Sequence, residues 1–227
     1  MGINLWRLAV GCGTALLAGL VSPTSAADNG VPLGGGAGIT LNGNPCTLNT
    51  IGNDRSGDLV GFTTDLCGGP GAEVTAQGAE ERGALGTVTA ANAYFHYAVI
   101  KFDRAKVIPV GNYDGFAING IGPDPAPGQS ACKQGSATGK DCKSIRPFLD
   151  SRPDRPTARM QASWQPSDYG GPVTADELLV GMIYNGFFVA SADAFSGPEI
   201  RVIYINAILA DANARGGPGA GFTPIPA

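Results

Sequence analysis

Cysteines set the first constraint on how this chain can fold. Of its five cysteines, Cys12 falls in an N-terminal segment that we expect to be cleaved off. An even number in an exported chain is most simply explained by two disulfides among the remaining four: Cys46, Cys67, Cys132 and Cys142. Three pairings are open, and pairing between sequence neighbours is the simplest. A zinc site is disfavoured, and we expect no metal, because the sequence has no Cys-x-x-Cys and a single histidine.

Residues 1–27 have the features of a secretory signal peptide. Arg7 supplies a positive charge, residues 8–21 are apolar, and small residues then favour cleavage after Ala26 or Ala27. A transmembrane anchor is the alternative, but the apolar run is shorter than the roughly 20 residues that cross a bilayer. Lipoprotein-type cleavage before Cys12 would leave most of the apolar run on the wrong side. We therefore expect a mature chain without a transmembrane anchor, secreted or associated with the cell envelope.

Size and composition favour a β-rich protein that does not bind nucleic acid. The roughly 200 residues that remain of 227 are enough for one large domain or two small ones. A net charge of -4 leaves no basic stripe that could neutralise phosphates. The 35 glycines and 17 prolines, with only 15% charged residues, indicate many short strands joined by turns.

Short apolar stretches separated by turns predict the strands. They lie at residues 59–62, 97–102, 106–110, 116–121, 178–184, 187–190 and 200–205. In the second of these, Ala98, Ile100 and Phe102 alternate with Val99 and Lys101, which predicts a half-buried strand. Residues 122–155 form a long turn-rich stretch that carries most of the prolines.

One helix is predicted near the C-terminus. Apolar residues recur at i, i+3, i+4 and i+7, on one helical face: Ile205, Ile208, Leu209 and Ala212. Gly216 and Gly217 end the pattern and Pro218 follows, as is usual at a helix C-terminus. Residues 218–227 are expected to form a flexible tail.

Three short stretches, in this order, resemble the catalytic motifs of chymotrypsin/trypsin-like serine proteases, particularly small exported ones of actinobacterial (mycobacterial) type. Thr63–Thr64–Asp65–Leu66–Cys67 resembles the family's Thr-Ala-Ala-His-Cys, whose cysteine is bridged to one about twenty residues earlier, where Cys46 lies. His96–Tyr97–Ala98–Val99 resembles Asp-Tyr-Ala-Val. Ser167–Asp168–Tyr169–Gly170–Gly171–Pro172 resembles Gly-Asp-Ser-Gly-Gly-Pro.

The resemblance extends over most of the mature chain and implies a fold. Residues 181–186 resemble the strand that lines the substrate cleft, residues 132–142 a bridged loop of the second barrel, and residues 205–214 the C-terminal helix. It implies an all-β fold of two six-stranded antiparallel Greek-key barrels with a closing helix. We expect the N-terminal barrel in residues 28–115 and the C-terminal barrel, with the helix, in residues 116–217.

The positions that match the family's catalytic triad carry other residues. The triad needs a histidine to move the serine proton and an aspartate to orient that histidine. Here Leu66, His96 and Tyr169 hold the histidine, aspartate and serine positions, and Ser167 replaces the glycine that supplies one oxyanion amide. Leucine has no proton acceptor, and the tyrosine phenol would occupy the place of the scissile carbonyl. We therefore expect no catalytic residues.

Two positions leave a choice of roles. Asp65 and His96 could form a swapped pair that serves another hydroxyl such as that of Ser167, although a structural role for His96 is favoured. Asp168 could form the buried ion pair that orders this loop in some family members, but a turn aspartate is slightly favoured.

The resemblance also indicates candidate binding residues and a function. Tyr169, Tyr184, Asn185 and Gly186 would line the former cleft, and Ser163, six residues before Tyr169, would be the floor of a specificity pocket. The sequence thus predicts a secreted, non-catalytic protease homologue without a cofactor, whose partner is a protein, peptide or envelope component. The alternatives are a hydrolase of altered mechanism that uses His96 and a purely structural envelope protein.

Overall fold

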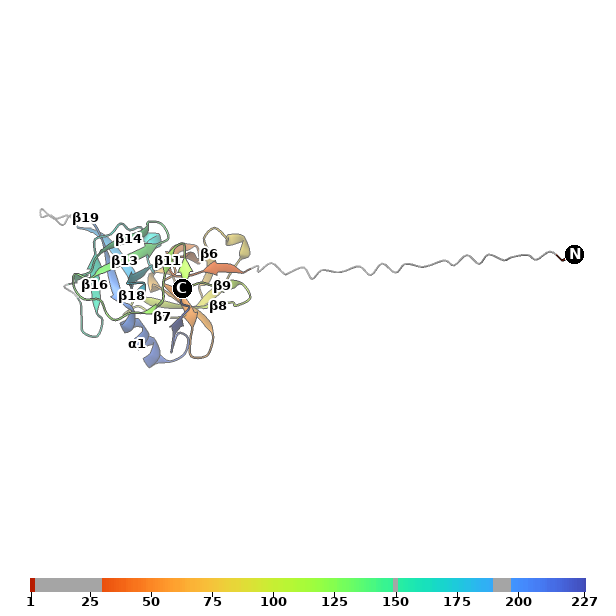
Figure 1. Cartoon of the computed structure of the whole chain (residues 1–227). Coiled ribbons are helices and arrows are strands. Elements are labelled where there is room, and N and C mark those ends of the chain that lie inside the picture. Colours follow the sequence, from red (N-terminus) through yellow and green to blue (C-terminus); the bar gives the residue numbers. More distant parts are fainter. Residues whose placement is uncertain (3–29, 149–150, 190–196) are drawn as a thin grey trace.

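The computed structural model describes residues 1–2, 30–148, 151–189 and 197–227. The predicted signal peptide lies outside these residues, except for its first two. Figure 1 shows a globular body in which two β-sheets lie side by side and the helix α1 packs at one end. In the described residues, no helix is both long and apolar enough to cross a membrane.

The N-terminal sheet is antiparallel throughout and has the strand order β20-β4-β5-β8-β7-β6-β2-β3. Its strands are β2 (Gly38–Leu41), β3 (Asn44–Thr47), β4 (Thr50–Asn53), β5 (Leu59–Thr63), β6 (Glu73–Ala76), β7 (Gly86–Asn92), β8 (Tyr97–Phe102) and β20 (Thr223–Pro224). The short 3-10 helices η1 (Asp65–Cys67) and η2 (Glu80–Arg82) lie in its loops.

The C-terminal sheet has the order β14-β13-β17-β18-β19-β16-β15, and β12 pairs in parallel with β18. Its strands are β12 (Gly120–Ile121), β13 (Ser130–Gly135), β14 (Gly139–Ser144), β15 (Arg146–Pro147), β16 (Thr157–Met160), β17 (Pro172–Ala175), β18 (Leu178–Val189) and β19 (Gly197–Tyr204). The 3-10 helix η3 (Pro166–Asp168) precedes β17, and α1 (Ile205–Arg215) follows β19 directly.

Two small strand pairs complete the fold. β1 (Val31–Leu33) pairs in parallel with β9 (Val107–Pro109), and β10 (Asn112–Tyr113) forms a hairpin with β11 (Phe116–Ala117). The expected all-β fold of two barrel-like sheets and a C-terminal helix is confirmed. Each sheet contains eight strands because short outer strands such as β12 and β20 join it.

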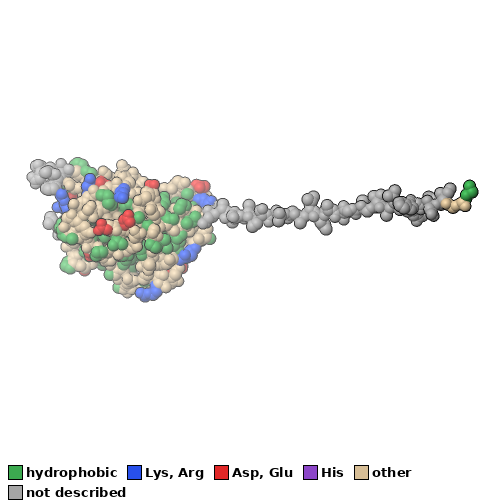
Figure 2. Space-filling model, in the orientation of Figure 1, with side chains coloured by type: hydrophobic (Ala, Val, Ile, Leu, Met, Phe, Trp, Pro, Cys, Tyr) green, Lys and Arg blue, Asp and Glu red, His purple; other side chains and the backbone are tan. Residues whose placement is uncertain are grey.

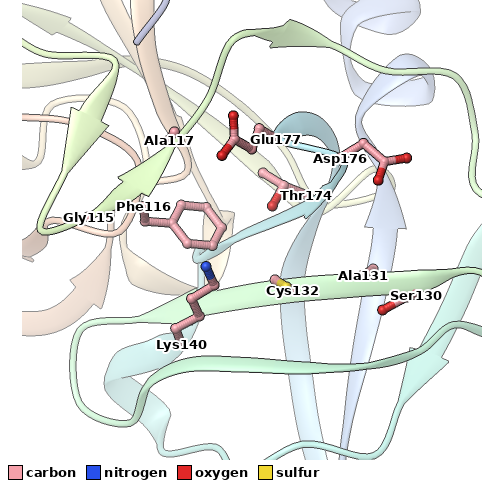
Figure 3. A pocket seen from close by; sticks show the side chains of 10 residues that line it. All are labelled: Gly115, Phe116, Ala117, Ser130, Ala131, Cys132, Lys140, Thr174, Asp176 and Glu177. Atoms are coloured by element: carbon pink, nitrogen blue, oxygen red, sulfur yellow. The ribbon is translucent and has the colours of Figure 1, made fainter.

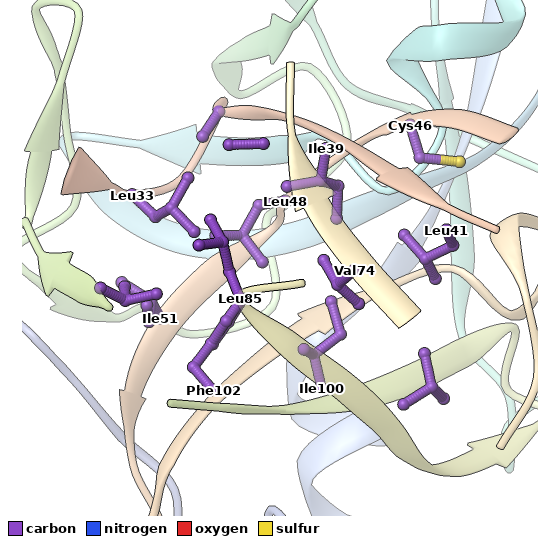
Figure 4. Close-up of a cluster of buried hydrophobic side chains, with 14 of the residues drawn as sticks. Leu33, Ile39, Leu41, Cys46, Leu48, Ile51, Val74, Leu85, Ile100 and Phe102 are labelled. Atoms are coloured by element: carbon purple, nitrogen blue, oxygen red, sulfur yellow. The ribbon is translucent and has the colours of Figure 1, made fainter. Parts of the chain in front are cut away.

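The strand β8 is buried on both faces, so the expectation of a half-buried strand is wrong. Ala98, Ile100 and Phe102 face the core of the N-terminal sheet, which Figure 4 shows as a cluster of buried hydrophobic side chains. Tyr97 and Val99 face a second core that includes the apolar face of α1. Of the alternating residues, only Lys101 is exposed. The period-two pattern therefore separates two cores, not core from solvent.

Other predicted segments differ from the structure in length. The turn-rich stretch 122–155 contains the β13–β14 hairpin, which the second disulfide crosses between directly paired residues. The stretch 116–121 is divided between β11 and β12, whereas 178–184 and 187–189 form the single strand β18. The expected disulfides Cys46–Cys67 and Cys132–Cys142 are both confirmed.

The helix agrees with its predicted pattern, because Ile205, Ile208 and Ala212 are buried. The Asp211 carboxylate anchors the helix to the N-terminal sheet by accepting hydrogen bonds from the Tyr97 hydroxyl (2.7 Å) and the Asn92 amide (2.6 Å). Arg215 donates to the same oxygen at 2.7 Å. Burial works to raise the pKa of Asp211, but these hydrogen bonds outweigh it and hold the pKa below its usual value. Burial and the Asp211 contact raise the pKa of Tyr97.

The C-terminal segment is ordered, so the expectation of a flexible tail at residues 218–227 is wrong. The strand β20 pairs with β4, and the Ile225 amide donates to the Ile51 carbonyl at 3.0 Å. Phe222 packs edge-on against Phe62 with ring centroids 5.0 Å apart. Ala220 is only 3% exposed. The chain end thus returns to the N-terminal sheet and joins the two halves of the fold.

Candidate functional site

The three stretches that resemble catalytic motifs come together between the two sheets. Register pairing of Thr63 with Ala98 places the end of β5, which leads to Leu66, beside the start of β8, which follows His96. The carbonyl of Tyr169 accepts a hydrogen bond from the Thr47 amide at 2.9 Å and lies 3.9 Å from Cys67 Sγ. The loop that carries Tyr169 therefore touches the turn that carries Leu66.

Glycine is required where this loop approaches the N-terminal sheet. Gly170 has a φ of 88°, and a Cβ there would lie 2.1 Å from Thr63 Oγ1. A Cβ on Gly171 would lie 2.4 Å from the Gln134 carbonyl. No side chain fits at these distances, so the two glycines preserve the backbone geometry of the loop.

Leu66 contributes no polar group and is exposed. It lies in the single turn η1, and 55% of the residue is accessible to solvent. Exposure of a large apolar side chain at the meeting point of two sheets has no stabilising effect on the fold itself. It is therefore available for contact with a partner.

His96 stacks on a buried tyrosine. Its ring lies parallel to that of Tyr184, with an interplanar angle of 6° and centroids 4.5 Å apart. His96 Nδ1 is 3.6 Å from the nearer carboxylate oxygen of Asp65, a contact longer than a hydrogen bond. Within the described part of the chain, this buried nitrogen has no hydrogen-bond partner. The two residues of the considered swapped pair are thus adjacent, but no serine or threonine hydroxyl described here bonds to the imidazole.

Tyr169 is covered by Trp164, which the sequence reasoning missed. The two rings stack with an interplanar angle of 14° and centroids 5.9 Å apart. The indole also lies directly on Gly186, where a Cβ would be 2.2 Å from the Trp164 ring. The indole N–H donates to the Phe187 carbonyl at 3.3 Å. Trp164 therefore covers part of the β18 segment that the resemblance places along the former cleft.

The amide donor that a protease would use for its oxyanion is already engaged. Acyl transfer needs backbone N–H groups that point at the developing negative charge. In this chain the Tyr169 N–H donates to the Pro166 carbonyl at 3.2 Å and closes the turn η3. An amide that satisfies a carbonyl of its own turn is not free to stabilise an oxyanion.

Asp168 is a buried ionic centre, so the slight preference for a turn aspartate is wrong. The residue is fully buried, and its Oδ1 accepts hydrogen bonds from the amides of Ala137 (2.9 Å) and Thr138 (3.2 Å). Its Oδ2 accepts from the Thr138 hydroxyl at 2.6 Å and from the Gln165 amide at 2.9 Å. The ammonium group of Lys133, also fully buried, lies 3.9 Å away.

This ionic centre holds the loop before Tyr169 against the β13–β14 hairpin. Burial lowers the pKa of Lys133, and the carboxylates of Asp168 and Asp141 partly offset that effect. The Lys133 ammonium also donates to the Thr138 hydroxyl. The geometry of the loop before Tyr169 is thus fixed by charge and hydrogen bonding.

The expected binding residues are only partly accessible. Tyr184 is 5% exposed and belongs to a core cluster, so its predicted direct contact with a ligand is wrong. Asn185 and Gly186 are partly exposed, but Trp164 lies over Gly186. Ser163 is exposed and lines a surface cavity of about 290 Å³ with Asp141 and other residues that do not include Tyr169.

Tyr94, two residues before His96, connects the N-terminal sheet to the segment that precedes β16. The Tyr94 hydroxyl donates to Asp154 at 2.7 Å, and this hydrogen bond lowers the pKa of Asp154. The Arg155 guanidinium lies 5.1 Å from the centroid of the Tyr94 ring and donates to the Tyr94 carbonyl at 3.2 Å. No sequence pattern pairs these residues, because they are 60 positions apart.

Potential metal ligands do not gather into a site in the described part of the chain. No cluster of three or more His, Cys, Asp or Glu side chains suited to a metal occurs among the described residues. Figure 2 shows acidic and basic side chains scattered over the visible face. The site is therefore mainly aromatic and apolar in character.

Solved structures with the same architecture are bacterial serine proteases. Protease A of Thermobifida fusca matches with a TM-score of 0.65 and 19% identity, over 87% of this chain and 100% of the protease. A Nocardiopsis protease matches with a TM-score of 0.64 and 19% identity, over 81% and 97% of the two chains. For chymotrypsin from Cellulomonas bogoriensis the values are 0.59 and 23%, over 81% and 97%.

The likeness is one of three-dimensional structure. No protein-family model matches the chain, and no curated protein matches its sequence. The structural matches nevertheless cover nearly the full length of the proteases. The chain therefore has the two-barrel fold of the chymotrypsin/trypsin-like serine proteases.

Proposed function

We propose that this chain is an exported, non-catalytic homologue of trypsin-like serine proteases that binds a protein, peptide or envelope component. Two disulfides are typical of proteins that function in an oxidising compartment, which supports export. The assignment of Leu66, His96 and Tyr169 to the triad positions rests on the resemblance of three stretches and on their meeting between the two sheets.

The main support is the set of side chains that meet at this point. Leu66 has no group that can accept a proton, and the imidazole of His96 stacks on Tyr184. Tyr169 stacks on Trp164, and its amide is bonded within η3. This geometry therefore does not support a general base, a nucleophile or an oxyanion donor. Each of the three contributes a large factor to the rate of acyl transfer.

An activity assay tests the loss of catalysis. The purified chain is incubated with a fluorophosphonate probe and with a mixed peptide library, next to a Ser167→Ala/Tyr169→Ala variant. We expect the two proteins to give the same background labelling and hydrolysis. Labelling or turnover that disappears in the variant would establish a working nucleophile and refute the proposal.

The binding half of the proposal rests on exposed apolar groups beside this site. Of the described residues, the exposed large apolar side chains other than Met1 are Leu66, Tyr94 and Phe188. Leu66 lies on the turn that touches Tyr169, Tyr94 lies two residues before His96, and Phe188 continues the strand covered by Trp164. Exposed apolar groups near a site of this kind could contribute to an interaction surface if they form one contiguous patch.

Fluorescence and crosslinking can test this surface. Trp6 and Trp164 are the two tryptophans of the chain. Because Trp6 lies in the expected signal peptide, the mature chain has Trp164 as its only tryptophan reporter. Mixed hexapeptides and solubilised envelope fragments serve as probes, and a photo-crosslinking amino acid replaces Leu66. We expect saturable crosslinking and a change in Trp164 emission. When the crosslinker replaces the exposed Glu81 instead, the emission change should remain and the crosslink should be absent. Absence of any saturable adduct would favour a purely structural envelope protein.

A second candidate function is a hydrolase of altered mechanism. It is favoured by one observation, the 3.6 Å approach of Asp65 to His96 Nδ1, because a carboxylate in this place could orient a general base. This alternative requires an ester or peptide hydrolysis that His96→Ala abolishes and that Asp65→Asn weakens. We expect no such activity, because the imidazole is stacked on Tyr184 and bonds to no described hydroxyl.

A further inference from the structure

A separate cavity lies beside the β17–β18 turn. It has a volume of about 240 Å³, and its walls come from the β10–β11 hairpin, β13, β14 and β17 (Figure 3). Cys132, one half of the second disulfide, forms part of the wall. None of the residues that lie at the triad positions lines this cavity. It is therefore distinct from the surface considered above.

The turn at the rim of the cavity is strained. Asp176 and Glu177 connect β17 to β18 and have φ values of 51° and 60°. Both central residues of such a two-residue turn have positive φ, for which Asn-Gly is favoured. Aspartate tolerates this region better than most residues, but glutamate does not. Strain of this kind is retained where a side chain has a use, and here it places two carboxylates at one cavity.

Charges of opposite sign face each other across this cavity. Figure 3 shows the Lys140 ammonium and the Glu177 carboxylate on opposite sides of the Phe116 ring. The Asn119 amide donates to Glu177 Oε2 at 2.9 Å and thereby holds the carboxylate. Lys140 lies 6.0 Å from the Phe116 centroid, and no carboxylate within the described residues pairs with it. The Lys140 charge is available to a ligand.

We propose that this cavity binds a small aliphatic zwitterion. Its carboxylate would face Lys140, its ammonium group would face Glu177, and its methylene groups would lie against Phe116. The volume is below the roughly 300–1,000 Å³ of sites for drug-sized ligands, which limits the occupant to about the size of an amino acid. A ligand with a single charge would satisfy one side of the cavity and leave the other unpaired.

A titration with molecules of graded length tests this proposal. Amide shifts of the ¹⁵N-labelled full chain are followed during titration with glycine, 4-aminobutyrate and 6-aminohexanoate. We expect saturable shifts, at millimolar or lower concentration, for residues around the cavity with at least one zwitterion. Butylamine and butyrate should each bind at least about tenfold more weakly, because they carry only one of the two charges.

Three variants separate binding from folding. Lys140→Gln and Glu177→Gln should each weaken binding about tenfold or more, whereas Lys143→Gln, an exposed neighbour on β14, should leave it unchanged. Changing Asp176–Glu177 to Asn–Gly should abolish binding while raising the melting temperature by roughly 2–4 °C, because about 1 kcal/mol of backbone strain is relieved. The proposal is overturned if no zwitterion binds, if butyrate or butylamine binds equally well, or if Lys140→Gln binds the zwitterion with the same affinity as the parent chain.

Discussion

The buried pair of Lys133 and Asp168 allows a quantitative prediction. Replacing Asp168 with asparagine keeps the volume but removes the negative charge beside an ammonium group that is fully buried. The amide nitrogen of asparagine can only donate, yet it would face backbone N–H groups that now donate to Asp168, such as that of Gln165. Breaking one partner of a buried ion pair typically costs about 3–5 kcal/mol of unfolding free energy.

A ceiling for the lysine contribution follows from proton linkage. Without Asp168, Lys133 can lose its proton when the chain folds. The largest loss of unfolding free energy that this proton release can cause at pH 7 follows from the difference of about 3.4 between the unfolded pKa and the pH. At about 1.36 kcal/mol for each pH unit, the loss is about 4.6 kcal/mol. Burial already lowers the pKa of Lys133 in the folded protein. The penalty is therefore fully present below the folded pKa and disappears as the pH rises towards the unfolded pKa. At pH 9.5 its ceiling is only about 1.2 kcal/mol.

Urea unfolding followed by circular dichroism at both pH values gives the measurement. We expect Asp168→Asn to lose about 3–5 kcal/mol at pH 7, and the lysine-dependent part of that loss to shrink at pH 9.5. Adding Lys133→Met should recover much of the stability. Asp58→Asn removes an exposed partner of Lys101 and should cost less than about 1 kcal/mol. A loss below about 1 kcal/mol for Asp168→Asn, or one that does not depend on pH, would refute this reasoning.

Three further changes test other parts of the fold. Replacing both cysteines of the first disulfide, which lie 21 residues apart, should lower the free energy of unfolding by about 3.4 kcal/mol. For the second disulfide, with a separation of 10 residues, the loss should be about 2.8 kcal/mol. An unchanged melting temperature would contradict the stabilising role of these bridges. Asp211→Asn should cost about 1.5–3 kcal/mol near neutral pH. The pKa of Asp211 is lowered by folding, so its contribution is present above its unfolded pKa and is lost as the pH falls through its folded pKa. A stability profile of Asp211→Asn that is as steep in acid as that of the parent would therefore be inconsistent. Deleting residues 218–227 should lower the unfolding free energy by at least about 2 kcal/mol, since β20 and a buried aromatic contact are lost; an unaltered midpoint would argue against the observed pairing.

Features governed by local rules were predictable from the sequence. The face of α1 follows directly from the spacing of Ile205, Ile208 and Ala212. The disulfides follow from an even cysteine count and from the resemblance of the surrounding residues. The two-barrel fold was implied by the resemblance of three stretches, in this order, to the motifs of the serine protease family.

Features that depend on contacts between distant segments were not predictable. Gly219 donates to the Asp54 carboxylate across 165 residues, and no local pattern in a Gly- and Pro-rich tail indicates such a partner. Lys133 lies in a polar sequence within a turn-rich stretch, yet it is fully buried because Asp168 reaches it from another segment. Trp164 gave no signal because its stacking partner and the glycine beneath it come from separate segments.

The buried pair of Lys133 and Asp168 bears on the function of the loop that carries Tyr169. Burying Lys133 with Asp168 is no more stabilising, in general, than a well-packed apolar pair would be. Such a centre is useful where it fixes one conformation of a loop, and here that loop carries Tyr169 to its contact with Trp164. The Tyr169 amide of the same loop donates to the Pro166 carbonyl, which supports the proposal that the rigid loop has a role other than acyl transfer. A rigid aromatic surface next to the exposed Leu66 is instead what recognition without cleavage requires, since preorganised aromatic groups bind with a small loss of conformational entropy.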